Sequence, residues 1–208
     1  KEWRIRKRLP YLKYREMEIF LEIFNRHKPA RILEWGSGFS TLFFPSRLDF
    51  PFEWYSIEHH REWYSELKEM NRHPSVKIIL KEPGQFPFTD TEGDGSYEDL
   101  KDYVDYPDEL GGFDCIIIDG RARNDCLLKA RKIINKGGLI ILHDANHKRY
   151  HRYFDHFSYQ ACFPDYRRTA GGMWIGSNTR ALDEVLDVKK HRRRWNLVQN
   201  KMAKILSI

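Results

Sequence analysis

Short apolar runs recur along the chain and alternate with segments whose apolar residues repeat at helical spacing. The run from Phe113 to Ile118 is continuous, which is typical of a strand buried on both faces of a parallel sheet. The other runs are shorter or alternate between apolar and polar positions. Together these patterns predict strands at residues 31–35, 53–58, 76–80, 113–118, 139–142, 161–168 and 173–175.

The segments between these runs carry the helical pattern. The first of them places four apolar residues on one helical face, at Met17, Phe20, Leu21 and Phe24. The same reasoning predicts helices at residues 11–26, 40–48, 60–72, 122–134 and 147–157, with one or two more from about residue 180.

Strands that alternate with helices indicate an α/β fold with a doubly wound, mostly parallel sheet. The end of the chain differs, because the last two predicted strands are joined by a short link that contains Ala170, Gly171 and Gly172. This link favours an antiparallel hairpin. Residues 81–112 are irregular, and a loop of this length inside a compact domain is usually a functional loop or lid.

The charge of the chain is unevenly distributed. Of the net +6, residues 1–15 carry +6 and residues 189–208 carry +7, so the acidic body between them carries −7. Basic ends on an acidic body do not describe a uniformly basic nucleic-acid face, and a nucleic-acid partner is therefore disfavoured. The ends could contact an anionic membrane surface or an acidic partner, but solvated helix faces are the favoured interpretation.

Length and composition fit one globular domain, with 41% hydrophobic residues in 208. The three cysteines, Cys115, Cys126 and Cys162, have neither zinc-site spacing nor the even number of a disulfide framework. No apolar run approaches the roughly 20 residues of a membrane span, and the start shows no signal-peptide pattern. We therefore expect a cytoplasmic protein.

Polar or glycine residues follow four of the predicted strands directly, at residues 34–38, 58–60, 119–121 and 143–146. Open α/β sheets bind ligands beyond the carboxyl ends of their strands. The agreement of four strand ends carries more weight than any one of them.

The turn after the first strand is the most specific of the four. Gly36 and Gly38 allow a sharp turn and a close ligand approach, and Ser40 and Thr41 offer hydroxyl partners. Thr41 stands where a dinucleotide fingerprint would have its third glycine, and no Walker lysine follows. An ordinary tight turn explains this segment as well as a ligand site does.

Glu58 ends the second strand. An acidic residue at this position can accept hydrogen bonds from both hydroxyls of a ribose. It could instead cap the helix of residues 60–72. Next to the glycine turn, the ribose interpretation is favoured.

These segments resemble the class I S-adenosylmethionine-dependent methyltransferases. The resemblance spans about residues 30–177 and comprises Glu34-x-Gly36-x-Gly38 with Ser40-Thr41, Ser56-Ile-Glu58, Phe113-Asp-x-Ile-Ile-Ile-Asp119-Gly120 and Gly137-Gly138-x-Ile-Ile-x-x-Asp144. It implies a Rossmann-like, seven-stranded sheet with an antiparallel last strand. With the charge distribution, it divides the chain into three expected segments: a basic helical extension at 1–29, an S-adenosylmethionine-binding catalytic domain at 30–178, and a basic helical tail at 179–208.

The resemblance also implies where the cofactor lies. The glycine turn would hold the methionine part, Glu58 the ribose, and residues 82–86 would surround the adenine. The expected cofactor-binding residues are Glu34, Trp35, Gly36, Ser37, Gly38, Ser40, Thr41, Glu58, His59, Asp119 and Gly120.

Asp119, His143 and Asp144 are the candidate catalytic residues, because a hydroxyl nucleophile must lose its proton to a base or to a metal-bound group. A plain structural histidine at a strand end explains His143 equally well. Metal-dependent O-methyltransferases resemble this arrangement, but their Asp-Asn pair would need Asn where this chain has Ala145. A divalent metal on Asp119 and Asp144 is therefore disfavoured.

Arg121, Tyr97 and Tyr106 are candidate substrate-binding residues. Arg121, like the nearby Arg123, could bind an acidic substrate or pair with the acidic loop, and the tyrosines could line a pocket or pack that loop down.

The first functional hypothesis is a methyltransferase that acts on a small molecule, at oxygen rather than nitrogen. The second is an RNA or protein methyltransferase that docks through the basic ends. The third is a nucleotide-binding oxidoreductase or a non-catalytic binding module. The sequence leaves the acceptor open, and it is also compatible with a homo-oligomer.

Overall fold

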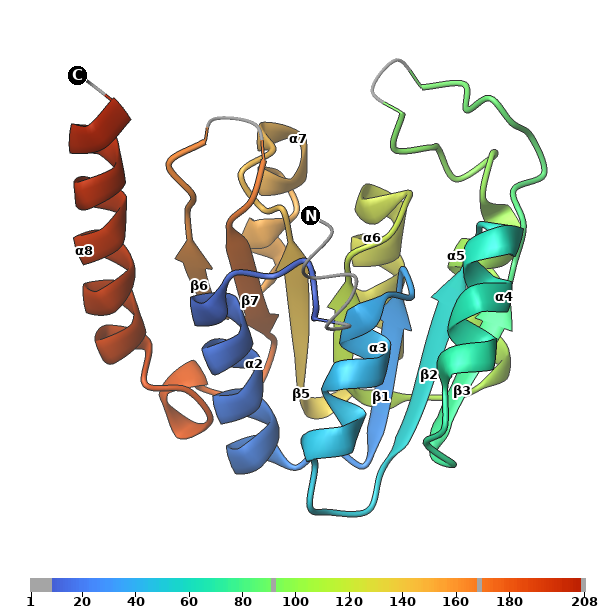
Figure 1. Ribbon diagram of the computed structural model, residues 1–208, viewed down its shortest axis with the longest axis horizontal. Coiled ribbons are helices and arrows are strands. Elements are labelled where there is room, and N and C mark those ends of the chain that lie inside the picture. Colours follow the sequence, from blue (N-terminus) through green and yellow to red (C-terminus); the bar gives the residue numbers. More distant parts are fainter. Residues whose placement is uncertain (1–8, 91–92, 168–169, 207–208) are drawn as a thin grey trace.

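The computed structural model describes residues 9–90, 93–167 and 170–206. One seven-stranded sheet runs through this part of the chain, with the strand order β3-β2-β1-β4-β5-β7-β6 (Figure 1). The basic residues 1–8 lie outside the described residues. The strands are β1 (Arg31–Trp35), β2 (Glu53–Glu58), β3 (Val76–Leu80), β4 (Phe113–Ile118), β5 (Ile134–His143), β6 (Tyr159–Phe163) and β7 (Met173–Ser177).

The sheet is parallel except for β7, which lies between β5 and β6 and is antiparallel to both. The predicted doubly wound sheet and its antiparallel last strand are therefore confirmed. Strand β1 pairs with β2 on one side and with β4 on the other, and Trp35 faces Ile57 and Ile118 in register. This register brings the carboxyl ends of the three strands to one edge of the sheet.

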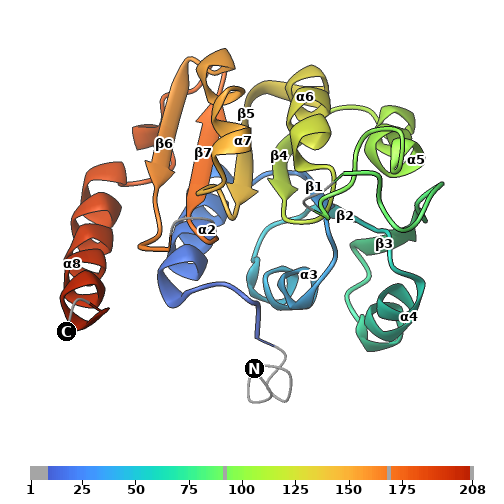
Figure 2. The ribbon, with the colours of Figure 1, turned by 90° about the horizontal axis from the view of Figure 1, so that it is seen from above.

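Helices cover both faces of the sheet (Figure 2). One face carries α2 (Tyr14–His27), α3 (Phe39–Phe43), α4 (Arg61–Met70) and α8 (Val188–Leu206), and the other carries α5 (Lys101–Asp105), α6 (Arg123–Ile133) and α7 (Lys148–His151). Side chains alternate between two buried clusters, so that Ile32 packs on the face of α2 while its neighbour Leu33 packs on the face of α6. A sheet covered on both faces explains the continuous apolar run of β4.

The helices at the two ends of the chain share the core of the sheet. Phe20 and Phe24 of α2 are buried and meet Phe44 and Trp54 at ring-centroid distances of 5.0 to 5.7 Å. At the other end, Trp195 of α8 is 2% exposed. Helices from both ends of the chain therefore pack on the same sheet. No helix among the described residues is long and apolar enough to span a bilayer.

Several element bounds differ from the sequence prediction. Helix α3 ends early because Pro45 begins the 3₁₀ turn η1 (Pro45–Arg47). The helix expected at 147–157 breaks into α7 and the 3₁₀ turn η3 (Phe154–His156). Strand β6 ends at Phe163 and not at residue 168, because Pro164 cannot donate to the next ladder hydrogen bond. Its link to β7 is accordingly longer than the predicted turn.

The loop before β4 is organised by its own carboxylates. It contains α5 and the 3₁₀ turn η2 (Tyr106–Glu109) within the segment that the sequence pattern showed as irregular. Asp99 accepts hydrogen bonds from the Thr89 and Ser96 backbone amides. Asp94 reaches the start of α6 and accepts from the Arg123 amide at 3.3 Å. The loop thereby caps a helix that has Ala122 at its N-cap position and so lacks a capping side chain of its own.

Candidate functional site

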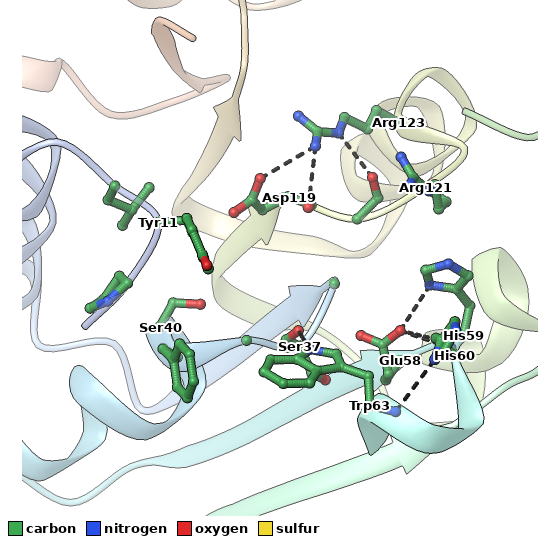
Figure 3. Close-up of a pocket in the computed structure, with 16 residues that line it drawn as sticks. Tyr11, Ser37, Ser40, Glu58, His59, His60, Trp63, Asp119, Arg121 and Arg123 are labelled. Atoms are coloured by element: carbon green, nitrogen blue, oxygen red, sulfur yellow. Dashed lines mark hydrogen bonds and ion pairs between the residues drawn. The ribbon is translucent and has the colours of Figure 1, made fainter. Parts of the chain in front are cut away.

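A cavity of about 560 Å³ lies over the carboxyl ends of β1, β2 and β4 (Figure 3). Its volume is that of a small-molecule site. Nine of the predicted site residues line it: Gly36, Ser37, Gly38, Ser40, Glu58, His59, Asp119, Gly120 and Arg121. His60, from the predicted strand end 58–60, and Arg123, which follows the strand end 119–121, also line it. Sequence reasoning missed the other lining residues, which are Pro10, Tyr11, Leu12, Phe39 and Trp63.

The two glycines of the first turn have different reasons to be glycine. Gly36 has a φ of +96°, and a Cβ there would lie 2.5 Å from the Gly120 backbone. Gly36 thus lets the turns after β1 and β4 pack together. Gly38 has an extended backbone, and among the described residues a Cβ there would meet only Ser40, at 3.6 Å from its Oγ and 4.0 Å from its backbone nitrogen. The described residues leave the space beside Gly38 unfilled, and this space is therefore open to a ligand.

Glu34 lies beneath the turn and does not line the cavity. Its side chain is fully buried and accepts hydrogen bonds from four neutral donors: Ser40 Oγ, Thr41 Oγ1, Trp54 Nε1 and Ser56 Oγ. Burial raises the pKa of Glu34 to about 7, although these four hydrogen bonds favour the carboxylate. Glu34 therefore fixes the glycine turn to β2. Thr41 and Trp35 are likewise buried behind the cavity wall.

Glu58 faces the cavity from the end of β2 (Figure 3). Its Oε1 accepts hydrogen bonds from the backbone amides of His59 and His60, at 2.9 and 2.8 Å. Within the described part of the chain, Oε2 has no hydrogen-bond donor. The capping and ribose interpretations are thus compatible, because one oxygen holds the start of α4 and the other remains available.

Two aromatic residues form the wall next to Glu58. The indole nitrogen of Trp63 donates to Ser37 O at 2.9 Å, and the Phe39 ring meets the Trp63 ring edge to face at 5.5 Å. The sequence contained a signal for Trp63, because a tryptophan in the first turn of an otherwise charged helix is rarely left exposed to solvent. A pocket wall of this kind suits a flat or apolar ligand group.

Asp119 is the cavity-facing member of the predicted catalytic group. Its Oδ1 lies 2.8 Å from Nδ1 of His143 and 3.4 Å from Nη2 of Arg123. Its Oδ2 has no partner among residues 9–90, 93–167 and 170–206. In Figure 3, Asp119 lies between Arg123 and Tyr11 of the N-terminal segment.

His143 is enclosed between carboxylates from two elements. On the side away from Asp119, its Nε2 lies 3.5 Å from Glu16 Oε2 of α2. Burial alone would lower the pKa of His143, but Asp119 and Glu16 raise it to about 10. At neutral pH the ring is therefore an imidazolium, which donates a hydrogen bond to Asp119 and forms an ion pair with Glu16. In this form it cannot accept a proton from a substrate.

The cluster of Asp119, His143 and Asp144 has the residue types of a metal site. Asp119, His143 and Asp144 bring ligand atoms within 4.8 Å of one another, which is a spacing that could hold an ion. However, Arg123 Nη1 lies 3.4 Å from Asp144 Oδ2, so its guanidinium already stands between the two aspartates. Both nitrogens of His143 face carboxylates as well. These residues do not fit a divalent cation.

The other predicted residues lie away from the cavity. Tyr97 donates to Asp105 at 2.5 Å, and the Tyr106 ring lies under Lys81 Nζ at 4.1 Å, so both tyrosines hold the loop before β4. Of the segment expected around an adenine, Glu82 pairs with Arg61 on the surface and Phe86 is 76% exposed.

Comparison with known proteins supports the fold through structure alone. No protein-family model and no curated protein sequence matches the chain. Among solved structures, the O-methyltransferase TomG from Streptomyces achromogenes, in complex with SAM, is 17% identical with a TM-score of 0.55, over 85% of this chain and 86% of that one. An O-methyltransferase from Bacillus cereus, in complex with SAH, is 15% identical with a TM-score of 0.57, over 84% and 86%.

A methyltransferase from Geobacter sulfurreducens matches in the same way, with 12% identity, a TM-score of 0.56 and coverage of 84% of this chain and 85% of that one. These identities are too low to carry activity, but the superpositions span most of both chains. Together with the strand order and the antiparallel β7, they show that this chain has the Rossmann-like fold of the class I S-adenosylmethionine-dependent methyltransferases.

Proposed function

We propose that the chain is an S-adenosylmethionine-dependent methyltransferase that methylates an oxygen atom of a small molecule. The observation that carries the proposal is a pair of open carboxylate oxygens on the two sides of the glycine turn. Glu58 Oε2 faces the cavity from β2, and Asp119 Oδ2 faces it from β4.

The cofactor side of the cavity would be the part between Gly38 and Glu58. The open space beside Gly38 would admit the methionine part, and the free oxygen of Glu58 would accept from the ribose hydroxyls. Trp63 and His59 extend the wall beyond Glu58. When bound, S-adenosylmethionine supplies a methyl group on a positively charged sulfur. This sulfur is a good leaving group because it departs as a neutral thioether.

The acceptor side would be the part between Asp119 and Tyr11. Asp119 Oδ2 would receive the proton of the acceptor hydroxyl. The His143 imidazolium and Arg123 would keep Oδ1 in place, so that Oδ2 stays directed into the cavity. Several structures with this fold are described as O-methyltransferases, which supports oxygen as the methylated atom.

The first test is calorimetry with S-adenosylmethionine and, separately, with NAD. We expect the sulfonium compound to bind and NAD not to bind. Binding of NAD alone would favour an oxidoreductase or a nucleotide-binding module. With labelled S-adenosylmethionine, transfer to hydroxylated small molecules would support the proposal, and transfer only to RNA or protein would contradict it.

The Glu58→Ala variant should bind S-adenosylmethionine about 100-fold more weakly. Hydrogen bonds to a charged group contribute roughly 1.5–3 kcal/mol each, and the ribose would lose this acceptor. The matched control is Glu53→Ala, because Glu53 is an exposed carboxylate at the other end of the same strand. Equal affinities for the two variants would contradict the assigned cofactor side.

A further inference from the structure

Arg123 supplies a fixed positive charge between the ends of β4 and β5. Its Nη2 lies 3.4 Å from Asp119 Oδ1, and its Nη1 lies 3.4 Å from Asp144 Oδ2. These aspartates are the pair that would have to hold a divalent cation at this place in the fold. The guanidinium therefore provides, within the protein, the charge that such an ion would bring.

Backbone carbonyls fix the guanidinium in this position. Nε donates to Gly120 O at 3.0 Å, and Nη1 donates to His143 O at 2.6 Å. Nη2 also lies 3.3 Å from Asp119 O. Every nitrogen of the planar group thus has an acceptor, and the residue is only 7% exposed. Moving the guanidinium aside for an ion would leave buried carbonyls without donors.

Arg123 stands at a position of the chain that disfavours a positive charge. It is the first residue of α6, where the helix dipole disfavours positive charge. The N-cap before it, Ala122, has a φ of +46° and no capping side chain. Asp94 offsets part of this cost by accepting from the Arg123 amide. A cation at a helix N-terminus and an N-cap without a capping side chain both run against local preference. Their occurrence together at Arg123 indicates a specific role for this residue.

His143 cannot complete a metal site in this arrangement. A metal-ligating imidazole must direct one of its ring nitrogens at the ion. Here Nδ1 faces Asp119 at 2.8 Å and Nε2 faces Glu16 at 3.5 Å. Within the described cluster, the only ligands left for an ion would be Asp119 and Asp144, and Arg123 already lies between them.

We infer that Arg123 takes the place of a divalent cation, that it positions Asp119, and that the site works without metal. The part of this inference that concerns methyl transfer rests on the function proposed above. The part that concerns metal binding does not, because it can be measured on the protein without cofactor or acceptor.

The test is a titration with Mn²⁺ followed by electron paramagnetic resonance. The unmodified protein should show no Mn²⁺ site at this cluster up to about 1 mM. The Arg123→Ala variant should bind Mn²⁺ at least roughly tenfold more tightly, because a like charge a few ångströms away is removed. Adding Asp144→Asn to that variant should abolish the gain.

Two matched variants separate charge from structure. Arg123→Lys keeps a cation and should not gain the Mn²⁺ site, whereas Arg121→Ala removes a neighbouring cavity arginine that does not contact Asp144. A folded Arg123→Ala that binds no Mn²⁺ would overturn the inference. So would an unmodified protein whose Mn²⁺ site disappears in Asp119→Asn and Asp144→Asn, a result that does not depend on whether Arg123→Ala folds.

Activity gives an independent readout. Methyl transfer by the unmodified protein should be unchanged in EDTA, and a requirement for Mg²⁺ would contradict the inference. Failure to bind S-adenosylmethionine would instead overturn the proposed function while leaving the Mn²⁺ result interpretable.

Discussion

Two neighbouring strand ends hold carboxylates in opposite ways. At the end of β1, Glu34 is fully buried and contacts only hydroxyl and indole donors. At the end of β4, Asp119 contacts a protonated histidine and an arginine, and one of its oxygens faces the cavity. The difference shows that the acidic residues of such sites are not equivalent. Neutral donors make Glu34 a structural anchor, whereas cations hold the half-buried Asp119 with one oxygen directed into the cavity.

Among the variants that test this comparison, Asp119→Asn should have the largest effect, which is a loss of turnover. Asn can still accept from His143 and Arg123 through its carbonyl, so the site should keep its geometry, but it cannot take a proton. Turnover should fall about 10³-fold, as is typical for the loss of a positioned base. The measurement is release of S-adenosylhomocysteine with an acceptor found by screening hydroxylated small molecules.

The control for this variant is Asp102→Asn, which changes an exposed aspartate on α5. Affinity for S-adenosylmethionine, measured by calorimetry, should change less than tenfold in Asp119→Asn. If turnover in Asp119→Asn stayed near that of the control, Asp119 would not be the base.

Glu34→Gln should remove a pH dependence of stability. The folded pKa of Glu34 is raised from 4.5 to about 7, so between these values the folded state keeps a proton that the unfolded state loses. The free energy of unfolding therefore falls as pH rises through this window, by about 3 kcal/mol. The contribution is most favourable below pH 4.5, and its loss is complete above pH 7.

Urea unfolding at several pH values between 4.5 and 8 measures this term. The difference in unfolding free energy between the two proteins should shift in favour of Glu34→Gln as pH rises. Parallel curves would show that Glu34 is ionised at every pH in the window, and the contrast with Asp119 would then be one of exposure alone.

The order of elements could be predicted from the sequence because periodicity reports burial on each face. The continuous apolar run of β4 and the glycine link before β7 located the parallel core and the antiparallel hairpin. The helix expected at 147–157 could not be resolved from the pattern. Its break before Phe154 depends on packing against Trp174, whose ring stacks on that phenylalanine at 4.6 Å.

The site could be predicted only where its residues follow strands. Glu58 and Asp119 were found in this way, whereas Tyr11 enters the cavity from a segment far away in sequence. Arg123 was predicted only as a possible partner of an acidic substrate or of the acidic loop, because its contact with Asp144 joins residues 21 positions apart. Glu34 has the residue type of a ligand contact, and only the structure shows that Trp54 and Ser56 surround it.

Of these variants, Gly38→Ala should have the smallest effect on stability. It still distinguishes the two strand ends, because it changes the turn after β1 and leaves the end of β4 unaltered. The extended backbone accepts alanine, and the new Cβ would make an ordinary contact with Ser40 Oγ at 3.6 Å. The free energy of unfolding should therefore fall by no more than about 1 kcal/mol, the cost of alanine at an N-cap.

The methyl group would, however, occupy the open space beside the turn. Affinity for S-adenosylmethionine should fall roughly tenfold, since a ligand that approaches the turn closely leaves no room for a Cβ. Calorimetry measures this loss, and unchanged affinity would mean that the ligand is held by Glu58 and its wall without approaching Gly38.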